Sequence, residues 1–311
     1  MTAFGTADAS SSATPTSATP TSADPLRLLT VHAHPDDESS KGAPTIAKYR
    51  SEGIFATLVC CTGGEAGDIL NPAMDRPEVR DNLAQVRLDE LSTAAAIIGY
   101  ERVEMLGYHD SGMPDSETNA REDNFWNAPL DSAVERLVRI IRRDRPQVIV
   151  TYSDDQQHYA HPDHLKVHEI TLPAFERAAS ADWYEDAGEP WQPLKLYYTE
   201  WSKERIQALH SKFEELGLES PFGGEWIERL EAMESVDRIT TRVPIAEFYE
   251  VREKALIAHA TQVDPTEKFW FGLPTEVARD VHPFDDYVLA QSLVVSELPE
   301  SDLFAGIPGR S

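Results

Sequence analysis

Two short stretches of the chain concentrate side chains that could bind a metal ion. In the first, His34, Asp36 and Asp37 follow an apolar run at residues 28–31. The run predicts a buried strand, and Pro35 ends it because proline lacks an amide hydrogen. Ionisable side chains are unusual inside a strand. They are typical of the carboxyl end of a parallel strand, where an open α/β sheet forms its ligand crevice.

The second stretch is His161-Pro-Asp-His164, which follows another apolar run at residues 148–152. His161 and His164 are three positions apart, so they share one face of a helical turn. Imidazole and carboxylate are ligand types that zinc favours, and a catalytic zinc ion keeps three protein ligands and a water. The two strand ends together therefore predict a metal site.

The predicted metal ligands are His34, Asp37 and His164, and Asp36 and His161 would transfer protons beside the metal. Each half of the pattern has an ordinary alternative. A lone pair of histidines is usually incidental, and Asp36-Asp37 alone would most often cap a helix. We favour the metal site because both strand ends carry His-Pro-Asp together with further residues of ligand type.

The motifs Ala33-His-Pro-Asp-Asp-Glu38 and His161-Pro-Asp-His164 resemble those of the PIG-L/LmbE family of zinc-dependent N-deacetylases. The resemblance covers residues 26–307. It implies a Rossmann-like α/β protein that hydrolyses amides of glucosamine derivatives. Segments outside the two motifs resemble the branch of the family that acts on mycothiol S-conjugates, and they are residues 39–42, 62–65, 69–75, 188–191, 195–198, 259–262 and 303–307.

That branch implies a zinc-dependent hydrolase that cleaves the amide between glucosamine and an S-substituted N-acetylcysteine. The products would be a mercapturic acid and glucosaminyl-inositol, which makes the reaction a detoxification step. The alternative is the sister deacetylase, which removes acetate from N-acetyl-glucosaminyl-inositol during mycothiol synthesis. Lys41 favours the amidase, because members of that type carry Ser-Lys-Gly at this position.

The resemblance implies one zinc ion per subunit, with iron(II) as the alternative metal. A purely structural zinc site in a protein without enzymatic activity is a further alternative. Such sites are usually closed sets of four ligands rich in cysteine. Neither Cys60 nor Cys61 belongs to either motif, so we favour the enzyme.

Four residues receive catalytic roles from the resemblance. Asp36 would be the general base, and His161 would stabilise the oxyanion or protonate the leaving amine. Tyr159 would donate a hydrogen bond to the developing oxyanion, and Asp163 would orient His161. Before this motif the family usually has two glycines, whereas this chain has Gln157-His158.

Four polar residues are candidates for substrate binding, namely Lys41, Asp68, Arg87 and Asp110. The positions of Arg87 and Asp110 bind the inositol end of the substrate in relatives. Asp68 stands where the family usually has glutamate. Taken singly, each of these residues would more often be a surface charge or part of a helix ion pair.

The order of the predicted elements indicates an α/β fold. Predicted strands at residues 55–61, 103–106 and 148–152 alternate with predicted helices at residues 41–52, 80–99 and 131–143. This alternation favours a Rossmann-like, mostly parallel sheet flanked by helices. Ser39 or Ser40 would cap the first helix. No Gly-x-Gly-x-x-Gly follows the first strand, so a dinucleotide cofactor is not predicted.

The chain divides into three predicted parts. Residues 1–24 would be a disordered tail, because they are rich in serine, threonine, alanine and proline. Residues 25–307 would form one domain, with a Rossmann-like core at 25–172 and an α/β extension at 173–307 that builds one wall of the pocket. The extension would contain a strand at 194–199, helices at 204–216 and 245–259, and loops at 182–191 and 264–286.

Composition narrows the range of partners. The 311 residues include 54 acidic and 28 basic side chains, with a formal charge of -26. This charge argues against nucleic acid and anionic membranes as partners. The family resemblance implies a small thiol-conjugate substrate. Cys60 and Cys61 would point to opposite faces of a strand, so we expect reduced thiols in a cytoplasmic protein. The sequence is compatible with a homo-oligomer.

Overall fold

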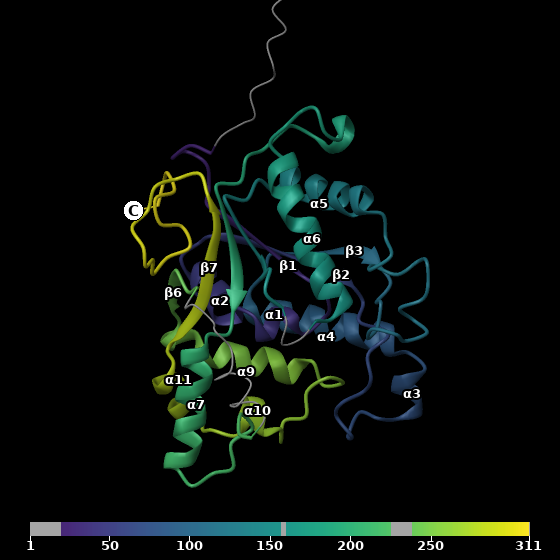
Figure 1. Ribbon diagram of the computed structural model, residues 1–311, viewed down its shortest axis with the longest axis vertical. Coiled ribbons are helices and arrows are strands. Elements are labelled where there is room, and N and C mark those ends of the chain that lie inside the picture. The colour runs from purple at the N-terminus through teal and green to yellow at the C-terminus, as the bar shows by residue number, and fades with distance from the viewer. Residues whose placement is uncertain (1–19, 157–159, 225–237, 311) are drawn as a thin grey trace, which may run out of the picture.

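A seven-stranded sheet lies at the centre of the computed structural model, which describes residues 20–156, 160–224 and 238–310. The strand order is β3-β2-β1-β4-β5-β7-β6 (Figure 1). The strands are β1 (Arg27–His32), β2 (Phe55–Thr62), β3 (Arg102–Tyr108), β4 (Val148–Tyr152), β5 (Lys195–Glu200), β6 (Thr241–Pro244) and β7 (Phe284–Ser292). Strands β1 to β5 pair in parallel, whereas β7 pairs antiparallel with β5 and β6. The prediction of a mostly parallel sheet is confirmed.

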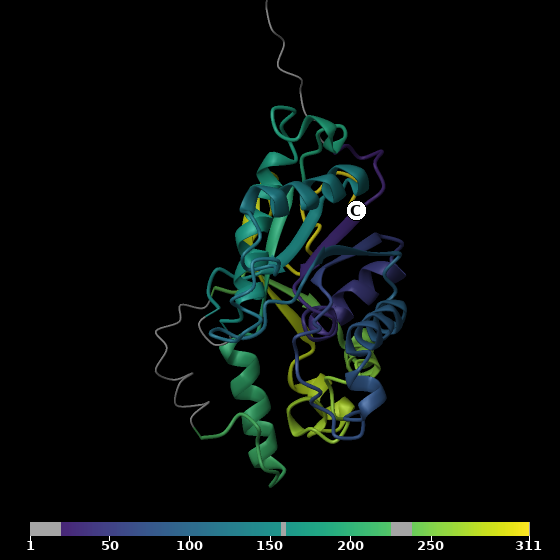
Figure 2. The ribbon, with the colours of Figure 1, turned by 90° about the vertical axis from the view of Figure 1, so that its right-hand side faces the viewer.

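Helices cover both faces of the parallel part of this sheet. They are α1 (Asp37–Ser40), α2 (Ala43–Ser51), α3 (Pro77–Arg80), α4 (Leu83–Ile98), α5 (Leu130–Asp144), α6 (Pro162–Arg177), α7 (Lys203–Glu215), α9 (Tyr249–Ala258), α10 (Lys268–Phe271) and α11 (Thr275–Val281), with short 3-10 turns η1 (Glu185–Ala187) and η2 (Ala246–Phe248). Figure 2 shows α5 and α6 on one side of the sheet and α2 and α4 on the other.

Alternation along the strands explains the two layers. Leu28 of β1 packs with residues of α2, α4 and α9, whereas the next residue, Leu29, packs with residues of α5 and α6. Both faces of the strand are therefore buried, which is why these strands read as continuous apolar runs. Cys60 and Cys61 likewise fall in different clusters, and both are buried free thiols as predicted.

Strand β1 lies between β2 and β4, so the direction of winding reverses beside it. Leu29 pairs with Thr57 of β2 on one side and with Ile149 of β4 on the other. In open α/β sheets the ligand crevice forms at such a reversal, outside the carboxyl ends of the strands. The loops that follow β1 to β4 therefore meet at the same edge of the sheet.

Two predictions of local structure were wrong. The helix predicted at residues 41–52 corresponds to α2, but Gly42, with a φ of 102°, precedes it in place of the predicted cap at Ser39 or Ser40, and these two serines belong to the short helix α1. A Cβ atom at Gly42 would lie 2.7 Å from the Tyr287 hydroxyl, so a side chain does not fit there. Residues 264–286, predicted as a loop, contain α10, α11 and the start of β7. The strand was missed because it contains Asp285 and Asp286, which tertiary partners keep buried.

Only the last part of the predicted N-terminal tail is among the described residues. Residues 1–19 of the predicted tail lie outside the described residues. Thr21 to Asp24 form a turn in which the Thr21 amide donates to the Asp24 carboxylate at 2.8 Å.

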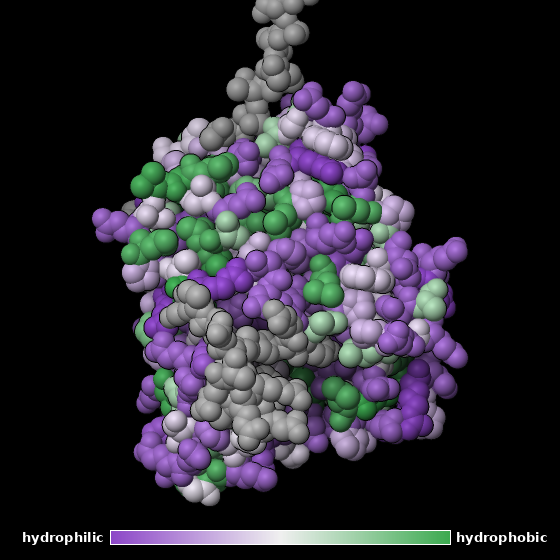
Figure 3. Space-filling model, viewed as in Figure 1, coloured by the Kyte–Doolittle hydropathy of each residue, from purple (hydrophilic) through white to green (hydrophobic). Residues whose placement is uncertain are grey.

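Over the described ranges, no helix has the length and apolarity needed to cross a membrane. Polar residues cover most of the face drawn in Figure 3, in keeping with the high content of charged residues.

A buried ion pair joins the segment after β7 to the middle of the sheet. Lys195 of β5 has a fully buried side chain, and its Nζ lies 2.5 Å from Glu300 Oε1. The other carboxylate oxygen accepts hydrogen bonds from Tyr197 at 2.5 Å and from Thr241 of β6 at 2.9 Å. Glu300 therefore ties two strands to the segment that follows the sheet.

Replacing Glu300 with glutamine should strongly destabilise the protein, because the charge that balances Lys195 is lost inside the core. Removing one partner of a buried ion pair typically costs about 3–5 kcal/mol. Denaturant unfolding followed by tryptophan fluorescence measures the change in the free energy of unfolding. The control is Glu297→Gln at an exposed carboxylate of the same segment, which should change it by less than ~0.5 kcal/mol. Equally small changes in both variants would contradict the expectation.

Candidate metal and substrate site

A strained turn after β1 presents the first group of site residues. Asp36 has a φ of 113°, a conformation that costs side chains other than glycine about 1–3 kcal/mol. Its amide donates to Glu38 Oε2 at 2.9 Å. The second oxygen, Oε1, accepts from the Ser39 hydroxyl at 2.6 Å and lies 2.7 Å from His259 Nε2. Glu38, buried with His259, thus holds the turn in this shape.

The three predicted metal ligands converge on one point. Nδ1 of His34 and Nε2 of His164 each lie 3.4 Å from Oδ2 of Asp37. The ligand atoms of the three residues all lie within 4.8 Å of one another, and the residues are buried. Donor atoms at 2.0–2.1 Å from a tetrahedral zinc ion are about 3.4 Å apart, so this donor set fits zinc.

The second nitrogen of His34 meets a further carboxylate. Nε2 of His34 lies 3.2 Å from Asp163 Oδ2 and 3.6 Å from Asp110 Oδ1. Asp163 is held in turn by Ser111, whose amide donates at 2.9 Å and whose hydroxyl also donates. A carboxylate behind a ligand histidine fixes its tautomer and ring orientation.

This arrangement corrects the expected role of Asp163. Asp163 was expected to orient His161, but its carboxylate contacts the candidate ligand His34. The backbone amide of Asp163 donates a hydrogen bond to Nδ1 of His161 at 3.2 Å. His161 stands at the position that caps α6, with its ring centre 4.6 Å from that of His34. His34, Asp110 and His161 form a second group of ligand-type atoms within 4.8 Å.

Charges around two of the three ligands, His164 and Asp37, suit metal binding, whereas His34 must give up a proton to a metal ion. Burial lowers the pKa of His164 to about 4, so its imidazole is neutral at pH 7 and can donate a lone pair. Burial opposes ionisation of Asp37, but Lys41 and His164 hold its pKa well below the ordinary value. Burial alone would lower the pKa of His34, but its hydrogen bonds to aspartates raise it well above the ordinary value.

Arg87, predicted to bind substrate, contacts the candidate base. From α4 its guanidinium donates to the Pro35 carbonyl at 2.6 Å, to the Gly64 carbonyl, and to Asp36 Oδ2 at 3.1 Å. A Cβ atom at Gly64 would lie 2.4 Å from Arg87, so the glycine makes room for the arginine. Burial raises the pKa of Asp36, and the charge of Arg87 opposes that rise.

Of the other residues predicted to bind substrate, Lys41 and Asp110 line the cleft and Asp68 does not. Lys41 Nζ lies 2.5 Å from Asp37 Oδ1, beside the candidate metal ligands. Asp110 lines the cleft and accepts from the Gly112 amide at 2.8 Å. Asp68 is exposed and outside the residues that line the cleft, and its backbone carbonyl accepts from Gln262 at 3.0 Å. Tyr159, with Gln157-His158, lies outside the described residues.

The site opens into a cleft of about 450 Å³, a size that accommodates a small-molecule substrate. One wall carries the metal-site residues. The cleft is also lined by apolar side chains from the C-terminal part of the chain, namely Leu256, Val263, Phe269 and Trp270. The C-terminal part of the chain therefore supplies one side of the cleft.

Sequence reasoning missed residues that hold the site together. It assigned no role to Glu38, although Glu38 closes the first motif and binds Asp36 through the backbone. It also missed Glu90 of α4, whose two oxygens accept from the amide and hydroxyl of Thr261 at 2.8 and 2.7 Å. Glu90 lies three positions after Arg87, hence on the same helix face, and that spacing was the available signal.

Comparison with known proteins agrees with this geometry. Residues 29–175 match the PIG-L family, described as GlcNAc-PI de-N-acetylase. Mycothiol S-conjugate amidase of Streptomyces coelicolor is 48% identical over 289 residues, which cover 91% of this chain and 97% of that protein. The 1D-myo-inositol 2-acetamido-2-deoxy-alpha-D-glucopyranoside deacetylase of Streptomyces scabiei is 38% identical over 298 residues, with coverage of 92% and 91%.

A solved structure shows the same fold. N,N'-diacetylchitobiose deacetylase from Pyrococcus horikoshii has a TM-score of 0.59 at 15% identity, covering 86% of this chain and 84% of that one. At this identity the likeness concerns the fold alone. The amidase and the deacetylase are much closer in sequence and cover nearly the whole described chain. On these grounds the chain belongs to the PIG-L family and is a metal-dependent hydrolase of amide bonds.

Proposed function

We propose that the protein is a mycothiol S-conjugate amidase that binds one zinc ion through His34, Asp37 and His164. The observation that carries this proposal is the 48% identity to a mycothiol S-conjugate amidase, against 38% to a deacetylase, with similar coverage. The donor set supports a single metal ion, since its distances suit a tetrahedral zinc site. Iron(II) is the alternative metal.

The residues around the ligands suit amide hydrolysis. Zinc, when bound, acts as a Lewis acid on the amide carbonyl and makes water more acidic. Asp36, held by Arg87 and Glu38, takes a proton from the attacking water. A carbon–oxygen bond forms at the carbonyl and the carbon–nitrogen bond breaks. His161 must bind a proton before it can give one to the leaving glucosamine nitrogen, because burial lowers its pKa. Asp163 keeps His34 oriented.

The competing function is removal of acetate from N-acetyl-glucosaminyl-inositol, which relatives at 38% identity are named for. A product assay separates the two. The zinc-loaded protein is offered a mycothiol S-conjugate and the N-acetyl precursor in parallel, and products are identified by mass spectrometry. We expect kcat/KM to be higher for the conjugate, with release of a mercapturic acid. Faster release of acetate from the precursor would overturn the assignment.

His164→Ala should abolish stoichiometric zinc binding, because it removes one of three donor atoms around Asp37. Metal content of the purified protein, measured by elemental analysis, is the readout. His34→Ala should have the same effect. The matched control is His210→Ala on α7, where the imidazole contacts Ser220 and lies outside the cleft. Retention of one zinc ion in both His34→Ala and His164→Ala would rule out this metal site.

Asp36→Asn should retain zinc but lose roughly 10²- to 10⁴-fold in kcat, the usual cost of removing a general base. Asparagine tolerates positive φ, so the turn should keep its shape. Asp115→Asn is the control, since Asp115 is exposed and also has a positive φ, of 65°. Zinc loss in proportion to the loss of activity would instead make Asp36 a metal ligand.

Lys41→Ala should lower the preference for the conjugate over the N-acetyl precursor by roughly 10- to 100-fold, the effect of one charged hydrogen bond. Lys41 also contacts the candidate ligand Asp37, so some loss on both substrates is expected. Because that contribution cancels in the ratio of the two kcat/KM values, the ratio reports substrate contact alone. An unchanged ratio would restrict Lys41 to the support of Asp37.

A further inference from the structure

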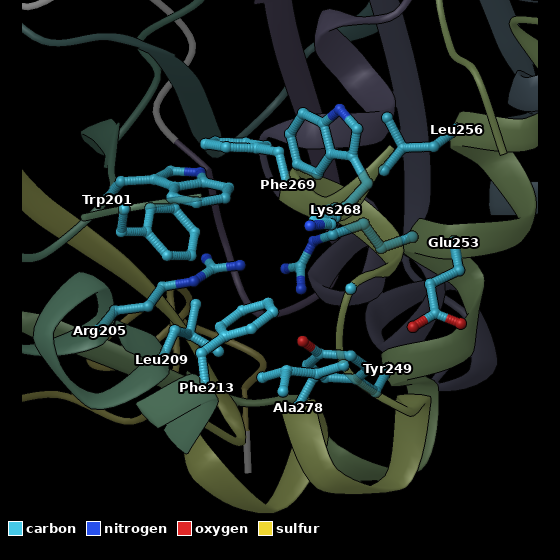
Figure 4. A pocket seen from close by; sticks show the side chains of 15 residues that line it. Trp201, Arg205, Leu209, Phe213, Tyr249, Glu253, Leu256, Lys268, Phe269 and Ala278 are labelled. Atoms are coloured by element: carbon cyan, nitrogen blue, oxygen red, sulfur yellow. The ribbon is translucent and has the colours of Figure 1, made fainter. Parts of the chain in front are cut away.

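A second, smaller cavity adjoins the catalytic cleft. The two share Leu256, Phe269 and Trp270 as a common wall. Figure 4 shows the side chains of the smaller cavity, which come from α7, α9, α10 and the segments beside them. Its volume of about 30 Å³ compares with the roughly 10–15 Å³ that one water needs. It is therefore large enough for a small polar group but not for a whole substrate.

Two buried arginines line this cavity. Arg205 of α7 and Arg252 of α9 are 5% and 4% exposed. Both face one oxygen of Asp285: Arg252 pairs with it directly, and Nη1 of Arg205 lies 4.0 Å away. The other Asp285 oxygen accepts from the Thr45 hydroxyl at 2.8 Å. Two positive charges thus share one carboxylate in this part of the structure.

The neighbouring Asp286 has its contacts within 4.0 Å with other residues, although its charge also acts on Arg205. It accepts from the Ser202 hydroxyl at 2.5 Å, lies 2.9 Å from His282 Nε2, and has Arg242 Nε at 3.6 Å. Burial, together with the charge of Arg252, lowers the pKa of Arg205 to about 10. Both guanidiniums are therefore charged at neutral pH.

Arg252 carries donors that the protein itself does not satisfy. Its Nε and Nη1 atoms are buried and have no hydrogen-bond partner within residues 20–156, 160–224 and 238–310. Buried donors of this kind are rare, because each forfeits its bond to water. A guanidinium presents its donors in a planar fork that matches a carboxylate. An anion with oxygen acceptors would satisfy these atoms and balance the second arginine.

The remaining charged residues of the cavity lie toward its edge. Figure 4 shows Arg205 pointing into the cavity, whereas Glu253 lies on the opposite side. Glu253 accepts from the Thr275 hydroxyl at 2.6 Å. Lys268 is exposed and pairs with Glu219 at 2.5 Å. Two buried guanidiniums thus line the cavity, which borders the catalytic cleft along Leu256, Phe269 and Trp270.

We propose that this cavity binds the terminal carboxylate of the S-substituent of the substrate. The inference rests on the proposed amidase function and names its substrate class: conjugates in which an apolar spacer, such as an aryl or alkyl chain, ends in a carboxylate. The spacer lies along Leu256, Phe269 and Trp270, and the carboxylate meets Arg205 and Arg252.

Two isosteric conjugates test the proposal. One carries an S-(4-carboxybenzyl) group and the other the neutral S-(4-carbamoylbenzyl) group, and kcat/KM is measured for both. The wild-type protein should prefer the acid by roughly 10- to 100-fold, the size of a charged hydrogen bond. Arg252→Gln and Arg205→Gln should each reduce that preference at least severalfold. Lys254→Gln removes the same charge from an exposed position on α9 and should leave the ratio unchanged.

The possible results separate the two hypotheses. If the wild-type protein hydrolyses both conjugates at equal rates, the carboxylate site is wrong while the amidase function stands. If it hydrolyses neither conjugate but deacetylates the N-acetyl precursor, the proposed function fails, and this inference fails with it. If Arg252→Gln does not fold, the ratio of kcat/KM for the acid conjugate to that for the neutral conjugate still tests the proposal in the wild-type protein. Arg205→Gln then serves as the variant that should lower this ratio.

A binding measurement distinguishes the substituent from a separate acid. 4-Methylbenzoate is titrated against the zinc-loaded protein and followed by tryptophan fluorescence, since Trp201 and Trp270 line the cavity. Binding that Arg252→Gln weakens, together with the wild-type preference for the acid conjugate, supports the proposal. The same binding with no preference between the conjugates would assign the cavity to free carboxylic acids and overturn the link to the substrate.

Discussion

The positive φ of Asp36 is the constraint on which the catalytic site depends. Without that turn, the chain would continue beyond β1 and could not bring Asp36 and Asp37 to the edge of the sheet together. The turn is unfavourable by itself, so surrounding groups must stabilise it. Glu38 binds its backbone, Arg87 binds both its carbonyl at Pro35 and its carboxylate, and His259 holds Glu38.

These contacts connect the C-terminal part of the chain to the turn after β1 that carries Asp36 and Asp37. His259 follows α9, and two residues later Thr261 binds Glu90 on α4. Asn71, in the loop after β2, donates to the carbonyl of Ala260 at 2.8 Å. The short segment after α9 thus fixes three elements around the cleft. The segments at residues 69–75 and 259–262 therefore have a structural role, apart from any contact with substrate.

Much of this arrangement could be predicted from the sequence, because local patterns reflect it directly. Apolar runs before His34 and His161 predicted strands, and the order of the elements predicted a mostly parallel sheet. The grouping of His34, Asp37 and His164 followed from strand ends meeting at one edge. What could not be predicted depends on partners far apart in the chain. Asp285 and Asp286 resemble loop residues until Arg252 and Ser202 are placed beside them.

The partner of the Asp163 carboxylate illustrates the same limit. The family resemblance implied that Asp163 orients His161, yet its carboxylate contacts His34, 129 positions away. Local spacing identifies which residues gather at a site but not which of two histidines a carboxylate will contact. That choice is set by Ser111, which binds both oxygens of Asp163 from the loop after β3.

The ion pair between Lys195 and Glu300 also has a consequence for synthesis of the protein. The two residues are 105 positions apart, and ribosomes add about 5–20 residues per second. For roughly 5–20 seconds, therefore, β5 exists without the carboxylate that its lysine requires. During that interval Lys195 must stay in contact with water, so the emerging sheet cannot close over β5.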